Sequence, residues 1–207
     1  MDMEAPQTTG LKYAYLTFDD GPHAEVTPRI LETLRRANAK ATFFVIGRKL
    51  LEPTLAKIVL SAVSDGHRFC NHTLTHPDLT KCSEQEIRRQ LTVTADLLRQ
   101  LGIETKLVRP PFGRSNATVA DVVQQLGFEL SLWNNDPRDW AAAADDSQWT
   151  RDAIAAVEQD AATVIVCHDT HARTALHLST LVADLATRGY RFATLGGPQQ
   201  DADSKLP

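Results

Sequence analysis

The stretch LTFDDGPHAEVTP, residues 16–28, places two adjacent aspartates between an apolar run and a glycine-proline turn. Neighbouring carboxylates repel each other, so Asp19 and Asp20 indicate either a solvated turn or a site that holds a cation. Thr27 followed by Pro28 is typical of a helix N-cap with proline at the first helical position. The stretch therefore predicts a strand, a polar turn and a helix.

The same alternation of β-rich runs and helical segments recurs along the chain. Runs of β-branched and aromatic residues predict seven strands, at residues 13–18, 41–47, 68–71, 106–109, 128–133, 163–167 and 190–194. Helix boundaries are indicated by a capping box at Ser83 and Glu86, by a cap at Asn116, and by Gly66, Gly102, Gly127 and Gly189 at helix ends. This order is typical of a parallel sheet covered by helices, as a β/α barrel or an open doubly wound sheet. No Gly-x-Gly-x-x-Gly follows the first strand, which disfavours dinucleotide binding.

Composition limits the class of protein. The chain has 207 residues, of which 43% are hydrophobic and 23% charged, and these values are ordinary for one globular domain. We expect that domain at residues 13–197, with a polar lead at 1–12 and a tail at 198–207. No segment is long and apolar enough to span a membrane. A net charge of -4 without a Lys/Arg cluster disfavours nucleic-acid binding.

The cysteines and the N-terminus say little about cell compartment. Cys70, Cys82 and Cys167 form no Cys-x-x-Cys pair; a Cys70–Cys82 bridge is one option, and buried thiols are the favoured one. The first ten residues, MDMEAPQTTG, lack the basic start and apolar core of a secretory signal. Localisation therefore stays open: secreted or in the cell envelope if a signal peptide was removed, otherwise cytoplasmic. We expect a monomer.

Polar side chains follow the carboxyl ends of five predicted strands. They are Asp19 and Asp20, His72 and His76, Arg109, Asp136 and Asp139, and His168. Both parallel α/β architectures build their sites at that edge, so these groups face one side. HTLTH at residues 72–76 spaces two imidazoles one helical turn apart, from which both can bind one ion. Two histidines and an aspartate leave a position for water, as a catalytic zinc-like centre requires.

Five stretches, in this order and spacing, carry a family resemblance: TFDDGP (17–22), HTLTH (72–76), RPPFG (109–113), DPRDW (136–140) and VCH (166–168). They resemble the motifs of the polysaccharide deacetylases of the NodB-homology type, carbohydrate esterase family 4, over about residues 13–195. The resemblance implies an α/β fold, a distorted (β/α)7-type barrel in a single NodB-homology domain, which agrees with the strand count. It also implies metal-dependent removal of acetyl groups from a glycan, usually from N-acetylglucosamine units of chitin oligomers, peptidoglycan or poly-N-acetylglucosamine.

The resemblance implies a metal centre with a base beside it. Asp20, His72 and His76 would bind one divalent ion, zinc in the first place, with cobalt or nickel as alternatives. Asp19 would be the general base, and Arg109 would orient it. Because a bound cation neutralises Asp20, Asp19 can stay ionised beside it and take a proton from water.

The resemblance further implies an acid and a substrate pocket. His168 would be the general acid, since an amine is a poor leaving group unless protonated, and Asp139 would raise the pKa of His168 and fix its tautomer. The backbone N–H of Phe112 would stabilise the oxyanion. Strand alternation puts Val166 and His168 on one face and turns Cys167 to the other, where it would be a buried thiol. The pocket would be completed by Pro111, Trp140 and Val166.

Other functions explain fewer of these residues. An aspartyl-phosphate phosphatase usually places its second aspartate two residues on, whereas Asp19 and Asp20 are adjacent. A two-His-one-carboxylate iron oxygenase leaves Arg109, Asp139 and His168 without a role. A non-catalytic carbohydrate-binding barrel should have lost a ligand or the base, and none is missing; acetylxylan esterase activity at the same site stays an alternative. Four other histidines are expected outside the metal centre: His23, His67, His171 and His177. Of these, His23 and His171 are expected close enough to the site to contact substrate.

Overall fold

The computed structural model of the chain describes residues 11–142, 144–157 and 162–196. The expected lead at 1–12 thus lies mostly outside the described residues, and the expected tail at 198–207 lies wholly outside them. Within them, one sheet contains seven strands that all run parallel. The strands are β1 (Lys12–Asp19), β2 (Thr42–Val45), β3 (Arg68–Asn71), β4 (Leu107–Val108), β5 (Glu129–Leu130), β6 (Thr163–His168) and β7 (Tyr190–Phe192). Each strand predicted from the sequence is confirmed, although most are shorter than the runs that indicated them.

The sheet curls into an incomplete barrel. Its strand order is β5-β4-β3-β2-β1-β6, and β7 pairs with the first residues of β1. The segment after β5 pairs with β6 through one isolated parallel bridge, between Asn135 and Ile165. Because β4 and β5 are only two residues long, no continuous ladder joins β5 to β6 to close a regular barrel in the described residues. The predicted distorted barrel in a single domain is therefore confirmed.

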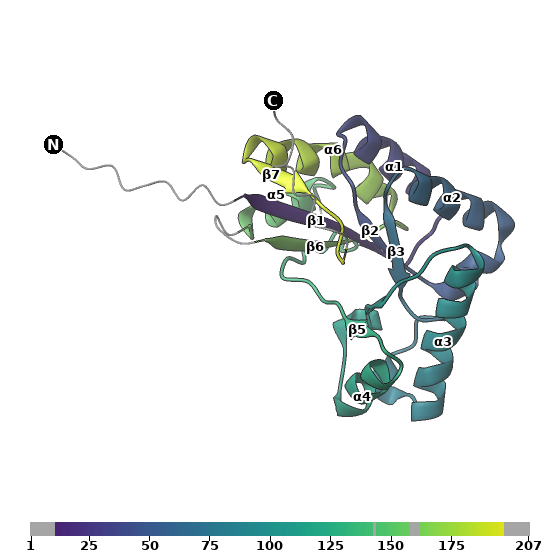
Figure 1. The fold of residues 1–207 in the computed structure, drawn as a ribbon. Coiled ribbons are helices and arrows are strands. Elements are labelled where there is room, and N and C mark those ends of the chain that lie inside the picture. The colour runs from purple at the N-terminus through teal and green to yellow at the C-terminus, as the bar shows by residue number, and fades with distance from the viewer. Residues whose placement is uncertain (1–10, 143, 158–161, 197–207) are drawn as a thin grey trace.

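Helices cover the outside of the sheet (Figure 1). They are α1 (Val26–Arg36), α2 (Pro53–Ser64), α3 (Glu84–Gln100), α4 (Ala117–Gln125), α5 (Gln148–Ala155) and α6 (Ala172–Thr187), with short 3-10 helices η1 (Gly47–Leu51), η2 (Leu79–Lys81) and η3 (Pro111–Gly113) in the loops. Figure 1 shows α1, α2 and α6 above the central strands, and α3 and α4 below, beside β5. None of the helices in the described ranges is long and apolar enough to cross a membrane.

Two of the predicted helix caps are present. The side chain of Ser83 accepts a hydrogen bond from the backbone N–H of Glu86 at 3.2 Å and caps α3. The Glu86 carboxylate accepts hydrogen bonds from Arg89, at 2.7 and 2.8 Å, so the capping box is only half formed. Asn116 caps α4 by accepting from the backbone N–H of Val119 at 3.0 Å.

The start of α1 differs from the prediction. The helix begins at Val26, and Nδ1 of His23 accepts hydrogen bonds from the backbone N–H groups of Glu25 and Val26. The predicted cap, Thr27, is buried in the first turn and donates its hydroxyl to Oδ2 of Asp169 at 2.6 Å. The prediction of Thr27 as N-cap was wrong because its hydroxyl is used in a tertiary contact.

The main core lies between the sheet and the helices. Phe18, Phe43 and Phe69 are paired in register on β1, β2 and β3, and their rings stack with centroids 5.0 Å apart in each pair. They belong to a buried cluster that includes apolar residues of α1 and α6. Since side chains alternate along a strand, packing Phe18 against the helices turns Thr17 and Asp19 toward the inside of the curled sheet.

The three cysteines carry free thiols. Cys70 and Cys167 are buried, as favoured from the sequence, whereas Cys82 is half-buried. Burial raises the pKa of Cys70 to about 11, and it raises the pKa of Cys167 well above its usual value. These thiols are therefore structural groups and not thiolate ligands.

Candidate active site

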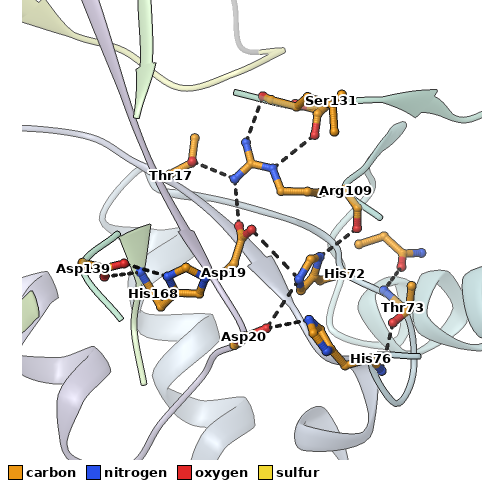
Figure 2. A network of polar contacts seen from close by, with 12 residues as sticks. Thr17, Asp19, Asp20, His72, Thr73, His76, Arg109, Ser131, Asp139 and His168 are labelled. Carbon is orange, nitrogen blue, oxygen red and sulfur yellow. Dashed lines mark hydrogen bonds and ion pairs between the residues drawn. The ribbon is translucent and has the colours of Figure 1, made fainter. Parts of the chain in front are cut away.

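Three side chains from two loops meet at the carboxyl ends of β1 and β3 (Figure 2). Oδ1 of Asp20 lies 3.4 Å from Nε2 of His72 and 3.1 Å from Nε2 of His76. We call Asp20, His72 and His76 the metal trio, since one ligand atom from each lies within 4.8 Å of the others. Oδ1 of Asp20 is buried and has no hydrogen-bond partner among the described residues. A buried carboxylate oxygen that faces two imidazole nitrogens fits a divalent ion.

The protonation states of the metal trio also suit a metal ion. Nδ1 of His72 lies 2.7 Å from the carbonyl oxygen of Arg109, which can only accept, so Nε2 keeps its lone pair for the site. Burial lowers the pKa of His76 and favours its neutral form. Burial alone would raise the pKa of Asp20, but the neighbouring imidazoles lower it to about 2. The trio thus offers one carboxylate oxygen and two imidazole nitrogens as ligand atoms.

Residues 72–76 form a loop and not the helical turn that their spacing predicted. Thr73 and His76 have φ values of 67° and 62°, in the left-handed region. The loop is held by side chains: Oδ1 of Asn71 accepts from the N–H of Thr73 at 2.9 Å, and Oε1 of Gln90 accepts from two further N–H groups. The two imidazoles still converge, with ring centroids 4.9 Å apart. The prediction of a helical turn was wrong, but the rings meet as expected.

Asp19 lies beside the metal trio in a buried ion pair. Its Oδ1 accepts a hydrogen bond from Nη1 of Arg109 at 2.8 Å, and its Oδ2 lies 4.0 Å from Nε2 of His72. Arg109 is fully buried; its guanidinium also donates to Oγ1 of Thr17 and to the carbonyl groups of Ser131 and Leu132 (Figure 2). Arg109 thus occupies one oxygen of Asp19 and leaves the other facing the trio, as a positioned base requires.

His168 is held by a second buried carboxylate. Strand register places His168 of β6 beside Asp19 of β1. Nδ1 of His168 lies 2.7 Å from Oδ1 of Asp139, and Oδ2 of Asp139 accepts from the backbone N–H of His168 and from the hydroxyl of Thr174. Burial alone would lower the pKa of His168, but the hydrogen bond and charge of Asp139 raise it to about 9. His168 is therefore protonated at neutral pH, with Nε2–H as its free donor.

A cavity of about 380 Å³ connects these groups. Besides the metal trio, Asp19 and His168, its lining consists of Phe112, Trp133, Asp136, Trp140, Val166 and His171. Phe112 and Trp140 are 59% and 51% exposed and form part of the mouth. Val166 lies on the same face as His168, while Cys167 points into the core, as strand alternation predicted. Pro111 is buried and does not line the cavity, in contrast to the sequence-based expectation.

Trp133, which was not among the predicted site residues, packs on the loop that carries Phe112. A Cβ on Gly113 would lie 2.7 Å from the Trp133 ring, so the ring packs directly on the loop backbone. The guanidinium of Arg109 lies 5.4 Å from the same ring. Trp133 follows β5 and is the last residue of the predicted strand 128–133. The rule that strand ends face the site could therefore have predicted it.

Strained backbone collects around the cavity. Of the six non-glycine residues with positive φ in the described ranges, all but Asn38 belong to the site loops: Asp20, Thr73, His76, Phe112 and Arg138. Such conformations cost about 1–3 kcal/mol each and persist only where neighbouring contacts hold them. The loops of the site are thus held in shape by their surroundings.

Comparison with known proteins identifies the family. Residues 7–131, more than half of the chain, match the family model described as polysaccharide deacetylase. The chain belongs to the polysaccharide deacetylase family. The peptidoglycan-N-acetylglucosamine deacetylase PgdA of Listeria monocytogenes is 37% identical over 194 residues, which are 93% of this chain and 40% of PgdA. A chitooligosaccharide deacetylase of Sinorhizobium fredii is 34% identical over 163 residues, 78% of this chain and 74% of that protein.

A solved structure confirms the fold of the chain. The peptidoglycan deacetylase PdaC from Bacillus subtilis superposes with a TM-score of 0.81 at 28% identity, covering 89% of this chain and 88% of that one. The chain spans 40% of the length of PgdA. The family is metal-dependent, and the metal trio is a possible site for the ion.

Proposed function

We propose that this polysaccharide deacetylase hydrolyses the acetamide of N-acetylglucosamine units in a glycan. The observation that carries the proposal is the meeting, in one cavity, of the metal trio, the Arg109-held Asp19 and the Asp139-held His168. The relatives named for peptidoglycan and for chitooligosaccharides support an N-acetylglucosamine substrate. We expect the active form to be a monomer, which sedimentation of the purified protein will test.

The base and the oxyanion donor lie on the metal side of the cavity. A divalent ion held by the metal trio would polarise water and the acetyl carbonyl, and zinc suits two imidazoles and one carboxylate, with cobalt or nickel as alternatives. Oδ2 of Asp19 takes the proton from the attacking water while Arg109 holds Oδ1. The backbone N–H of Phe112 stabilises the developing oxyanion.

The acid lies on the β6 side of the cavity. Nε2–H of His168 delivers its proton to the amide nitrogen as the carbon–nitrogen bond breaks, so that acetate and a free amino sugar leave. Asp139 keeps Nδ1 occupied and thereby directs Nε2 toward the substrate. Val166, Trp133 and Trp140 line the same cavity and would surround the acetyl group.

Acetate release from chitin oligomers and peptidoglycan fragments is expected to stop with EDTA and to return when zinc or cobalt is added. The reason is that the proposed chemistry needs a Lewis acid at the metal trio. Acetylated xylan, in the same panel, tests the alternative: release from xylan alone would assign O-deacetylation to the site. Equal release with and without the chelator would contradict a metal-dependent mechanism, and no release from any glycan would favour a non-catalytic binding protein.

Asp139→Asn is expected to move the alkaline limb of the kcat/KM profile to lower pH. His168 acts as an acid only while protonated, so activity is present below its pKa of about 9 and is lost as pH rises through that value. Without the Asp139 charge the effect of burial prevails, and the limb should fall by about 1–3 pH units. The control is Asp136→Asn, an exposed carboxylate in the same cavity. Coincident profiles for wild type and Asp139→Asn would exclude Asp139 as the group that tunes His168.

A further inference from the structure

Asp169 follows the proposed acid and has no part in the mechanism above. It is 1% exposed, and its backbone N–H donates to the carbonyl oxygen of Asp19 at 3.3 Å. Its Oδ2 accepts from the hydroxyl of Thr27 at 2.6 Å, but its Oδ1 has no hydrogen-bond partner among the described residues. A buried carboxylate oxygen without a hydrogen-bond partner lowers the stability of the fold. Asp169 therefore calls for an explanation other than stability.

The carboxylate of Asp169 packs directly on Gly21. A Cβ on Gly21 would lie 2.0 Å from Oδ2 and 2.1 Å from Oδ1 of Asp169, far inside the distance of any real contact. The φ of Gly21 lies outside the left-handed region, so its backbone conformation does not require glycine. The missing side chain is needed because Asp169 occupies that space.

Three elements hold this contact in place. The hydroxyl of Thr27, in the first turn of α1, accepts from the N–H of His23 at 2.7 Å while it donates to Asp169 at the end of β6. The carbonyl of Gly21 accepts from the N–H of Ile46, after β2, at 3.1 Å. Because Asp169 is buried and bound to Thr27, its carboxylate has no free room to swing away from Gly21.

Asp20, the neighbour of Gly21, has an unfavourable backbone conformation. Asp20 has φ 74°, a left-handed conformation that costs a residue other than glycine roughly 1–2 kcal/mol. That conformation directs its carboxylate at His72 and His76, 3.4 and 3.1 Å away. A turn that relaxed by rotating at Asp20 would move this carboxylate out of the metal trio.

We propose that Asp169 is a positioning residue whose carboxylate, held by Thr27, supports Gly21 and so keeps Asp20 aimed at the two imidazoles of the metal trio. Its effect on turnover rests on the proposed function, whereas its effect on metal binding does not. Burial raises the pKa of Asp169 to about 7, so an amide of the same shape is a close substitute for it. Shape and the Thr27 hydrogen bond, more than charge, therefore carry the role.

The test measures zinc affinity, by competition with a chromophoric chelator, together with kcat at saturating zinc. Asp169→Ala should weaken zinc binding by roughly 10- to 100-fold, the usual effect of losing a group that orients a ligand, and should lower kcat even at saturating zinc. Asp169→Asn should stay close to wild type. Gly21→Ala should bind zinc at least as weakly as Asp169→Ala, because its Cβ displaces the carboxylate.

The double variant Gly21→Ala/Asp169→Ala separates positioning from general damage. Removing the carboxylate removes the collision, so the double variant should bind zinc no more weakly than Asp169→Ala alone. The proposal would be overturned if the losses of zinc affinity in the two single variants added up in the double variant. It would also be overturned if Asp169→Ala kept wild-type zinc affinity and showed only a lower Tm. If Asp169→Ala does not fold, Thr27→Val removes the hydroxyl at nearly equal volume, and wild-type zinc affinity there would equally overturn it. These affinities stay readable even if the wild type releases no acetate.

Discussion

Replacing Asp19 with asparagine is expected to lower kcat by about 10²–10⁴-fold while zinc stays bound, the range attributed to a positioned general base. Asparagine has the shape of aspartate, and its Oδ1 can still accept the hydrogen bond from Arg109. The amide nitrogen that replaces Oδ2 cannot take a proton from water. Rate and zinc content measured on one preparation will therefore show the loss of a base without the loss of a ligand.

Folding of Asp19→Asn has to be checked, because the change leaves Arg109 buried without its countercharge. Removing one partner of a buried ion pair costs about 3–5 kcal/mol, and the retained hydrogen bonds of Arg109 should make the cost smaller here. Thermal unfolding will show whether the variant is folded at the assay temperature. Asp136→Asn is the matched control, since it removes a carboxylate from the same cavity and should keep turnover within a few fold. More than a tenth of wild-type turnover with full zinc would exclude Asp19 as the base.

The arrangement of the strands was predictable because it depends on local pattern. The run that contains Phe18 ends at Asp19, and polar residues end four later strands in the same way. Carboxyl ends of parallel strands meet at one edge, so the convergence of the trio with Asp19, Arg109 and His168 follows from the strand assignment alone. The trio, Asp19 and His168 line one cavity, and Arg109 is buried next to it, hydrogen-bonded to Asp19.

The loop conformations were not predictable because their partners lie far away in the sequence. The loop at residues 72–76 depends on Gln90 of α3, whose Oε1 accepts from the backbone N–H groups of Leu74 and Thr75. The hydroxyl of Thr27 bonds Asp169, 142 residues further on, where the sequence pattern favoured a local cap. The need for glycine at position 21 arises only once β6 places Asp169 against it.

Replacing His76 with asparagine is expected to weaken zinc binding by more than about 100-fold, because losing a group that only orients a ligand already costs 10- to 100-fold. Asparagine is chosen because it tolerates the left-handed conformation at this position, φ 62°, better than alanine does. Its shorter side chain does not extend to the point where the imidazole nitrogen lies. The backbone should therefore persist while one of the three ligands is lost.

The structural cost of this change should be small. The side chain of His76 is 22% exposed, and its ring contacts Phe112 edge-on with centroids 4.8 Å apart at the mouth of the cavity. His177→Asn is the matched control: His177 lies on α6, outside the cavity lining, and this variant should bind zinc like wild type. Unchanged zinc affinity in His76→Asn would exclude the metal trio as the site.

Together the two variants separate ligand from base. Asp19→Asn should bind zinc and fail to turn over, whereas His76→Asn should lose both properties at zinc concentrations that saturate the wild type. Excess zinc should restore part of the activity of His76→Asn and none of that of Asp19→Asn, because only the first defect is one of occupancy. Recovery of Asp19→Asn with excess zinc would instead make its defect one of metal occupancy, and would contradict the assignment of Asp19 as the base.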